Sequence, residues 1–360
     1  MENIVQNFNS IDLKRDLEEL FQRTRAKLGK EDVDHITRIS RISIAFEIVG
    51  RLLIHISFEP ITFIVGVIAL WVHKQIEGVE MGHNIQHGSY ERIPGAEKFH
   101  RKNQWYRFHS RLPLHAPSWR YSHNGLHHGY TNVVGKDPDA RLYLRNSEKK
   151  ERRWYHRLLF LETAINWPNI LFNANIMASG LFDAYLRDEN NLEVLPDKSW
   201  KNIWKAHKRA FAGVILYTLR EYIFFPLLAG PNFAKVLLGN WLSSLMRNLF
   251  TAPALYASHI NTDVETFPHN KQAADRAEWY LMQIKSTQNF EVPYFASILV
   301  GGLDYQIEHH LCPKLPPNRL REIAPEVRRI CEKHGVRYNS NPWRVALRLV
   351  FAQLKVLNHA

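Results

Sequence analysis

Residues 43–72 read SIAFEIVGRLLIHISFEPITFIVGVIALWV and contain two apolar runs, 43–57 and 61–72, interrupted at Glu59-Pro60. Each run is shorter than the ~20 apolar residues of a spanning helix. Because proline interrupts a helix, the pattern predicts a helical hairpin with a tight turn at Glu59-Pro60. Glu47 and Arg51 lie one helical turn apart in the first run and are placed to pair. Hydropathy alone leaves a buried hairpin of a soluble protein open as the alternative.

A second pair of apolar runs lies further along the chain. It extends over residues 211–229, turns at Gly230-Pro231-Asn232 and returns over residues 233–258. The charged residues that interrupt it are Arg220, Glu221 and Arg247. Charges inside such a hairpin are expected to be functional or to extend toward the membrane surface. The sequence therefore predicts two hairpins, at about residues 43–76 and 211–258.

The distribution of basic residues orients these hairpins. The clearest basic clusters are residues 141–157 and 201–209, and both lie between the hairpins. Cytoplasmic segments of membrane proteins are enriched in Lys and Arg, so this middle segment is predicted to be cytoplasmic. Because each hairpin crosses twice, the N-terminus and the C-terminal part are expected on the same side. We therefore expect a multi-pass integral membrane protein.

The composition agrees with a few spans beneath a large polar layer. Hydrophobic residues make up 45% of the 360 residues, yet the mean hydropathy is −0.32, which is low for a chain lying mostly in a membrane. The formal net charge of +12 suits the anionic face of a bilayer or an acidic partner. Nucleic acid is not expected as a partner, because no zinc-finger, RNP-like or basic-zipper pattern is present. Cys312 and Cys331 form no CxxC motif and indicate neither a disulfide framework nor a thiolate metal site.

Amphipathic helices are predicted on both sides of the hairpins. A helix over residues 11–30 has its apolar residues on one face, and a second helical pattern begins near Glu31. Asn318 is placed to cap a helix over residues 319–334 with Gly335 as its stop, and Asn341-Pro342 begins a last amphipathic helix. The predicted division is amphipathic helices in 1–42, a membrane domain in 43–340 and a C-terminal helix in 341–360.

Three histidine motifs occur in the segments that flank the hairpins. They are His83-Asn84-Ile85-Gln86-His87, His123-Asn124-Gly125-Leu126-His127-His128 and Gln306-Ile307-Glu308-His309-His310. On a helix, histidines four residues apart share one face at about 6 Å between Cβ atoms, which suits chelation of one metal ion. Adjacent histidines diverge by about 100°, so His127 and His128 are able to face different ions. One such pair is most often an ordinary surface or core feature, whereas three motifs together indicate a two-metal centre.

This combination resembles the membrane fatty acid desaturase family in its HxxxH, HxxxHH, QxxHH form, which is similar to acyl-lipid, linoleoyl-CoA and front-end desaturases. The resemblance covers about residues 36–338. It implies an all-α integral membrane fold, with four transmembrane helices in two hairpins beneath a cytosolic helical cap that holds a di-iron centre. The active site would then face the cytoplasm. This topology agrees with the one predicted from apolar runs and charge.

The resemblance also implies the metal ligands. The motif histidines expected to bind the two irons are His83, His87, His123, His127, His128, His309 and His310. A further ligand is expected just after the fourth membrane helix, where His259 stands, with His269 as the competing candidate. Gln306 stands where related enzymes have another histidine and would be a weaker or indirect ligand.

Ligand imidazoles need hydrogen-bond partners that fix their tautomers. The candidates near the motifs are Glu80, Asn84, Asn124, Asp304 and Glu308. Asp137 and Asp139 are further candidates that are equally well explained as solvated loop carboxylates.

Removing hydrogen from an unactivated methylene requires a strongly oxidising metal centre. Neutral imidazole suits iron and leaves positions open for dioxygen. Soluble di-iron proteins instead use carboxylates in paired ExxH motifs. Glu80–His83 and Glu97–His100 match ExxH, but the second lies in a polar stretch with Pro and Gly that is not expected to be helical. The sequence therefore favours the histidine-based centre.

The implied reaction is the O2-dependent desaturation of a fatty acyl chain carried by CoA, a carrier protein or a phospholipid. The sequence contains no HPGG haem segment, flavin fingerprint or cysteine cluster, so a separate ferredoxin- or cytochrome-type donor with its reductase is expected. Two alternatives stay open: a hydroxylase on the same scaffold, and a non-redox polyhistidine protein that binds or transports zinc.

Overall fold

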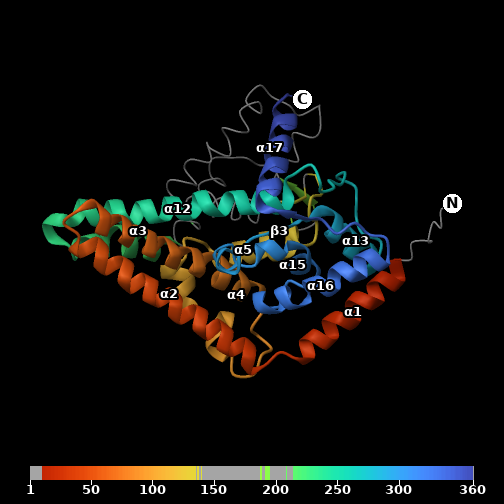
Figure 1. Ribbon diagram of the computed structural model, residues 1–360, viewed down its shortest axis with the longest axis horizontal. Coiled ribbons are helices and arrows are strands. Elements are labelled where there is room, and N and C mark those ends of the chain that lie inside the picture. Colours follow the sequence, from red (N-terminus) through yellow and green to blue (C-terminus); the bar gives the residue numbers. More distant parts are fainter. Residues whose placement is uncertain are drawn as a thin grey trace.

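The computed structural model describes residues 10–134, 136, 137, 139, 187, 188, 191–194, 208 and 214–359. These residues are mostly helical, with two short two-stranded sheets. Long helices extend together to one end of the molecule, and several shorter helices gather at the other end (Figure 1). Apart from Lys208, the two basic clusters that orient the predicted hairpins lie outside the described residues.

The first hairpin consists of α2 (Lys30–Ile56) and α3 (Pro60–Gln75). Glu59 caps α3, because its carboxylate accepts hydrogen bonds from the backbone N–H groups of Ile61 and Thr62 at 2.6 and 2.7 Å. Pro60 occupies the first turn, where its missing N–H costs no hydrogen bond. The predicted turn at Glu59-Pro60 is therefore confirmed.

Two glycines let the helices of this hairpin approach closely. A Cβ added at Gly50 would lie 2.6 Å from the backbone nitrogen of Leu70, and one added at Gly66 would lie 2.9 Å from that of Ile54. Any larger side chain would force the backbones apart. Contacts between small residues are how helices pack closely in membranes.

The second hairpin is described from residue 214 onward. Residues 214–219 are helical and continue through η8 (Arg220–Phe224) and α11 (Phe225–Leu227). The 3₁₀ turn η9 (Gly230–Asn232) then reverses the chain into α12 (Phe233–His259), which has 27 residues. The predicted turn at Gly230-Pro231-Asn232 is confirmed, while residues 211–213 lie outside the described part of the chain.

Among the described residues, one helical stretch is long and apolar enough to cross a membrane. It spans Pro60–His87, 28 residues, and joins α3 to η1 (Ile76–His83) and α4 (Asn84–His87). The chain thus stays helical past Lys74, as the predicted pairing of His83 with His87 requires. The four predicted spans stay a prediction.

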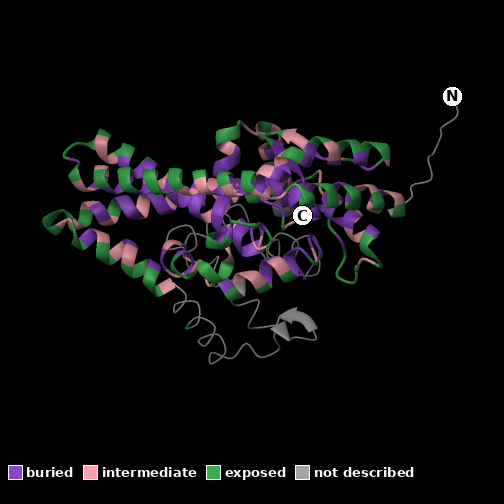
Figure 2. Ribbon diagram, turned by 90° about the horizontal axis from the view of Figure 1, so that it is seen from below, coloured by how far each residue is buried: buried purple, intermediate pink, exposed green. Residues whose placement is uncertain are grey.

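The helices at the other end pack around a core of their own. They are α1 (Ser10–Ala26), α13 (Arg276–Ser286), α15 (Gln306–Leu311) and α16 (Pro317–Lys333). The predicted apolar face of the first helix is confirmed by four buried side chains, Leu13, Leu17, Leu20 and Phe21. Figure 2 shows buried residues turned toward the interior of this assembly and exposed ones toward its surface.

The start of α16 differs from the prediction. Asn318 does not cap this helix: α16 begins at Pro317, and the Asn318 side chain donates to Asp32 Oδ1 at 2.7 Å. Proline needs no N–H partner at a helix start, so a capping side chain is not required there. The helix ends just before Gly335, whose φ of 66° fits the predicted stop. The last helix, α17 (Trp343–His359), follows Asn341-Pro342 as predicted.

Short elements connect these helices. Between α4 and the second hairpin they are η2 (Glu97–Phe99), η3 (Arg101–Asn103), η4 (Arg107–Arg111), α5 (Ala116–Trp119), η5 (Arg120–His127), β1 (Arg187–Asp188) and β2 (Asn191–Val194). After α13 they are β3 (Asn289–Glu291), α14 (Tyr294–Leu299), η10 (Leu303–Tyr305) and β4 (Ser340–Pro342). Strands β1 and β2 pair antiparallel, and β3 pairs with β4 in parallel.

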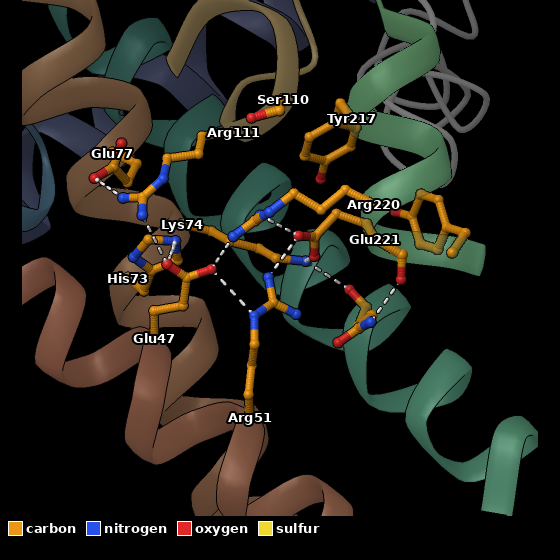
Figure 3. Close-up of polar contacts among 12 residues, drawn as sticks. Glu47, Arg51, His73, Lys74, Glu77, Ser110, Arg111, Tyr217, Arg220 and Glu221 are labelled. Carbon is orange, nitrogen blue, oxygen red and sulfur yellow. Dashed lines mark hydrogen bonds and ion pairs between the residues drawn. The ribbon is translucent and has the colours of Figure 1, made fainter. Parts of the chain in front are cut away.

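Charged side chains of the two hairpins, η1 and η4 form one connected set of ion pairs, most of which Figure 3 shows. We call it the charge network, and its members are Glu47, Arg51, His73, Lys74, Glu77, Arg107, Arg111, Arg220 and Glu221. The predicted pair of Glu47 with Arg51 is confirmed at 3.1 Å. Glu221 joins the second hairpin to the first, because it contacts Arg51 at 2.6 Å and Lys74 at 3.0 Å.

Candidate metal centre

Eight histidines from four separate segments converge where α4, η5, α12 and α15 meet. They are His83, His87, His123, His127, His128, His259, His309 and His310. Seven are buried and His83 is half-buried. Neighbouring rings lie 4.3–5.7 Å apart between centroids. The structure thus brings together every histidine for which the sequence predicted a metal-binding role, His269 excepted.

Two of the histidine motifs contain π-helical residues. His83 is the last residue of η1, while His123 and His127 lie within η5. A π-helix closes hydrogen bonds over five residues instead of four, as in the bond from His128 N–H to the His123 carbonyl at 3.1 Å. The additional residue in the turn changes which side chains share a face. Such segments occur frequently at functional sites.

The first histidine group consists of His83, His87, His123 and His309, and its candidate ligand atoms all lie within 4.8 Å of one another. The Nε2 atom of His83 lies 3.2 Å from those of both His87 and His123. Two nitrogens bound to one metal at about 2.1 Å are about 3.0–3.4 Å apart at ordinary coordination angles. These separations therefore fit ligation of a shared ion.

The second histidine group consists of His127, His259 and His310, all buried, and meets the same 4.8 Å criterion. The Gln306 amide lies beside this group, with its Nε2 atom 2.8 Å from His259 Nε2. Gln306 Oε1 is buried and has no hydrogen-bond partner among the described residues. The Gln306 side chain is therefore close enough to bind a metal ion held by this group, or to contact that ion's ligand His259.

His128 lies between the two groups. Its ring is 4.8 Å from that of His87 in the first group and 4.3 Å from that of His310 in the second. The neighbouring His127 belongs to the second group, and the two rings are inclined by 74°. This divergence agrees with the expectation that adjacent histidines point to different positions.

Several buried ring nitrogens have no hydrogen-bond partner among the described residues, which indicates whether the site fits a metal ion. Both ring nitrogens of His128 and the Nε2 atoms of His309 and His310 are buried without a hydrogen-bond partner among the described residues. Leaving buried polar atoms unpaired costs free energy, and coordination of a cation would relieve that cost. Burial also lowers the pKa of His128, His309 and His310 well below the ordinary value, so these rings are neutral, as ligation requires. The donor set fits a transition metal such as iron or zinc.

Two aspartates contact the Nδ1 atoms of candidate ligand histidines. His123 Nδ1 lies 2.6 Å from Asp139 Oδ2, and His127 Nδ1 lies 2.9 Å from Asp137 Oδ1. A hydrogen bond at Nδ1 fixes the tautomer that presents Nε2 to a metal. Burial disfavours the charged form of His127, but the two carboxylates outweigh it and raise its pKa to about 9. Asp137 and Asp139, which the sequence left equally explained as solvated carboxylates, thus contact the site.

The sequence did not indicate the residues that orient His310. Its Nδ1 atom lies 2.9 Å from Gln283 Oε1 and 3.2 Å from Thr131 Oγ1. Thr131 also donates to Gln283 Oε1 or to the His127 carbonyl, each at 2.8 Å, and so links the second and third motifs. Gln283 lies in α13, far from any motif, and no local spacing could have identified it.

Asn84, Asn124 and Glu308 hydrogen-bond to groups other than the ligand histidines. Asn84 Nδ2 donates to the backbone carbonyl of Glu80 at 2.9 Å, and Asn124 Nδ2 to that of Gln86 at 3.0 Å. The Glu308 carboxylate accepts from Asn289 Nδ2 and Tyr338 O–H, each at 2.8 Å. Burial raises the pKa of Glu308 to about 7.

The remaining candidates from the sequence are Glu80, Asp304 and the competing ligand candidate His269. The Glu80 carboxylate is 3.4 Å from Arg321 and 3.6 Å from His35. Asp304 is buried, which raises its pKa to about 6. His269 Nδ1 lies 3.1 Å from the Val134 carbonyl, and His269 belongs to neither histidine group of the described residues.

Two neighbouring groups of buried imidazoles at the end of helical hairpins define a helical polyhistidine protein able to hold metal. A family model described as fatty acid desaturase matches residues 60–342, and the chain belongs to that family. The resemblance inferred from the three histidine motifs is thereby confirmed. The chain is an oxidoreductase of lipid metabolism.

Several curated proteins are similar to this chain. The NADPH-dependent stearoyl-CoA 9-desaturase of Mycobacterium tuberculosis is 27% identical over 351 residues, 96% of this chain and 77% of the relative. The sn-1 linoleoyl-lipid 6-desaturase of Arthrospira platensis is 27% identical over 76% of this chain and 72% of its own length. The acyl-lipid (8-3)-desaturase of Physcomitrium patens is 29% identical over 77% and 57%, respectively. Members of this kind introduce double bonds into fatty acids.

Proposed function

We propose that this chain is a di-iron, O2-dependent desaturase that introduces a double bond into the acyl chain of a lipid or acyl thioester. The observation that carries the proposal is the pair of histidine groups whose candidate ligand nitrogens converge, several of them, in His128, His309 and His310, without a hydrogen-bond partner among the described residues. Bound iron would activate dioxygen and supply the oxidising power that an unactivated methylene demands. The eight histidines would hold two irons, with His128 placed between the two positions.

The surrounding residues would hold this ligand set in place. Asp139 and Asp137 keep the protons of His123 and His127 on Nδ1, so that Nε2 faces the metal. Gln283 and Thr131 do the same for His310. Gln306 would tune the second group through its contact with His259. Burial of the cluster excludes bulk water from the oxidising centre.

The proposal includes four membrane spans in two hairpins. The turns at Glu59-Pro60 and at η9 lie at the same end of the molecule (Figure 1). Helices α4 and α15, which carry His87, His309 and His310, lie away from that end. With 27 residues each, α2 and α12 are about 40 Å long, which is enough to cross a bilayer. Exposed apolar side chains such as Ile48, Leu52, Ile64 and Leu227 cover the hairpins. The histidine centre would then face the cytoplasm beneath α13, α15 and α16.

We also propose the partners. The substrate is a fatty acyl chain on CoA, a carrier protein or a phospholipid, and a separate ferredoxin- or cytochrome-type protein with its reductase supplies electrons. The proposal is supported by the names of the relatives, which act on stearoyl-CoA, linoleoyl-lipid or acyl-lipid. The basic charge of the chain suits an acidic donor.

His309→Ala is the test of this function. The change removes a buried ligand of the first group and is expected to lower desaturation at least ~100-fold together with the iron content. The measurements are fatty-acid profiling in a host with few endogenous lipids and metal analysis of the purified chain, for which about two irons per chain are expected. His269→Ala is the matched control, because His269 lies outside both groups and its loss should leave both readouts unchanged.

Three outcomes would contradict the proposal. Full activity and iron content in His309→Ala would remove the third motif from the ligand set. A product that gains oxygen instead of losing two hydrogens would indicate a hydroxylase. Stoichiometric zinc without iron would favour a non-redox metal-binding protein.

A further inference from the structure

The charge network carries more positive than negative charge. Its five cations are Arg51, Lys74, Arg107, Arg111 and Arg220, and its three carboxylates are Glu47, Glu77 and Glu221. With His73 neutral, a surplus of two positive charges remains among the described residues. The metal centre uses none of these side chains.

This surplus is largely removed from water. The side chains of Glu77 and Glu221 are 1% exposed and that of Lys74 is 3% exposed. Buried charge without a counter-charge is strongly unfavourable, so the network favours an additional anion. Arg111 and Arg220 are the most exposed members, at 17% and 13%, and an anion would reach the network through them.

The Arg111 guanidinium has capacity for such a ligand. Its Nε atom is buried and has no hydrogen-bond partner among the described residues. Its other two nitrogens contact Glu47 and Glu77, each at 3.2 Å. Figure 3 shows Arg111 and Arg220 approaching Glu47 from two different segments, with Ser110 beside Arg111.

An apolar groove of about 420 Å³ begins at this point. Arg220 and Ser110 are among its lining residues, but its surface is almost entirely apolar, and its walls include Trp105, Tyr106, Leu219, Ile223, Phe224 and Leu227. The last four follow one side of the helix for about 12 Å, from Arg220 toward the turn at η9. The apolar residues are 44–63% exposed, so this wall lies on the outer surface of the hairpin.

We propose that this groove binds an anionic phospholipid of the bilayer, with its phosphate beside Arg220 and Arg111 and an acyl chain along Leu219, Ile223 and Leu227. Arginine forks match phosphate oxygens in two-point hydrogen bonds, and the surplus charge favours a headgroup without a cation of its own. The apolar wall gives a reason for a lipid instead of inorganic phosphate. The inference depends on the membrane placement proposed above and not on the metal chemistry.

The test measures lipid binding by the full chain purified in detergent. Native mass spectrometry and the thermal unfolding midpoint are recorded during titration with phosphatidylglycerol, phosphatidylcholine or oleate. Phosphatidylglycerol is expected to stay bound and to raise the midpoint, at an affinity at least about tenfold above that of phosphatidylcholine, whose choline is repelled by the surplus charge. Equal binding of the two phospholipids would overturn the proposal, and tighter binding of oleate would assign the groove to a free fatty acid.

Two substitutions that each lower the net charge of the network by one sharpen the test. Arg220→Gln removes one surplus cation, while Ser110→Asp supplies an internal carboxylate and leaves every ion pair of the network intact. Each is expected to weaken phosphatidylglycerol binding about tenfold. Ser110→Asn is the control of equal size and should bind as the unaltered chain does; equal binding by Ser110→Asp and Ser110→Asn would refute the role of charge. Loss of desaturation while phosphatidylglycerol binding stays intact would count against the proposed metal chemistry and not against the lipid site.

Discussion

The histidine centre and the charge network are both buried polar clusters, but their chemistry is opposite. In the centre, imidazole nitrogens from different segments lie close together, and several have no partner among the described residues. In the network, full charges of both signs are paired at close range. The first arrangement is suited to receive cations, and the second holds segments of the two hairpins together. Both clusters include residues of the continuous helix Pro60–His87, which carries Lys74 and Glu77 before His83 and His87.

Glu221→Gln should break the network with the largest effect on stability. Glu221 is 1% exposed and contacts Arg51, Lys74 and Arg220, so its neutralisation leaves three cations facing an amide. Removal of one partner from a buried ion pair typically costs about 3–5 kcal/mol. The free energy of unfolding, measured with denaturant in detergent, should fall by that amount.

An exposed ion pair of the same chemistry provides the control for Glu221→Gln. Glu332 pairs with Arg328 at 3.0 Å, and both side chains are more than half exposed. Glu332→Gln should change stability by about 0.5 kcal/mol or less, because water and salt screen the pair. Equal effects of the two substitutions would contradict a structural role for the buried network.

Asp137→Asn tests how the histidine centre is held. Asp137 is fully buried, contacts His127 Nδ1 and accepts backbone hydrogen bonds from Asn132 and Asp139. Loss of such a charged partner typically lowers metal affinity or activity about 10–100-fold. Iron retention during dialysis against a chelator, together with desaturation, measures the effect.

Asp139→Asn is the matched comparison for Asp137→Asn. Its side chain is 42% exposed, so water can replace part of its interaction with His123. We expect a loss below about tenfold. A larger loss in Asp139→Asn than in Asp137→Asn would show that Asp139, and not Asp137, contributes more to holding the metal ligands.

Local spacing in the sequence was sufficient for several of these features. The turn at Glu59-Pro60 and the pair of Glu47 with Arg51 depend on residues at most four positions apart, and both predictions are confirmed. The three histidine motifs predicted a shared centre for the same reason. The π-helical segments that contain His83, His123 and His127 had no recognisable local signal in the sequence.

Contacts between distant segments could not be derived from spacing. Arg51 and Glu221 are 170 positions apart, and Thr131 and His310 are 179 apart. The sequence indicated that these residues were charged or polar but not which partner each would meet. Gln283 and Thr131, the partners of His310, were missed for this reason, whereas Asp137 and Asp139 were among the candidates. Asn318 was assigned a capping role that Pro317 makes unnecessary.

A small, pH-dependent effect is expected for Asp16, which pairs with Lys333 and His334. Hydrogen bonds from Lys333 and His334 lower its pKa from 3.8 to about 2. A carboxylate whose pKa is lower in the folded state stabilises the fold above its unfolded pKa, and this contribution is lost as the pH falls from about 4 to about 2. Because Lys333 is 61% exposed, solvent screening limits the contribution to about 1 kcal/mol or less. Asp16→Asn should therefore lower the unfolding midpoint slightly at pH 7 and have no effect near pH 2; a difference that persists at the lower pH would exclude this charge as its cause.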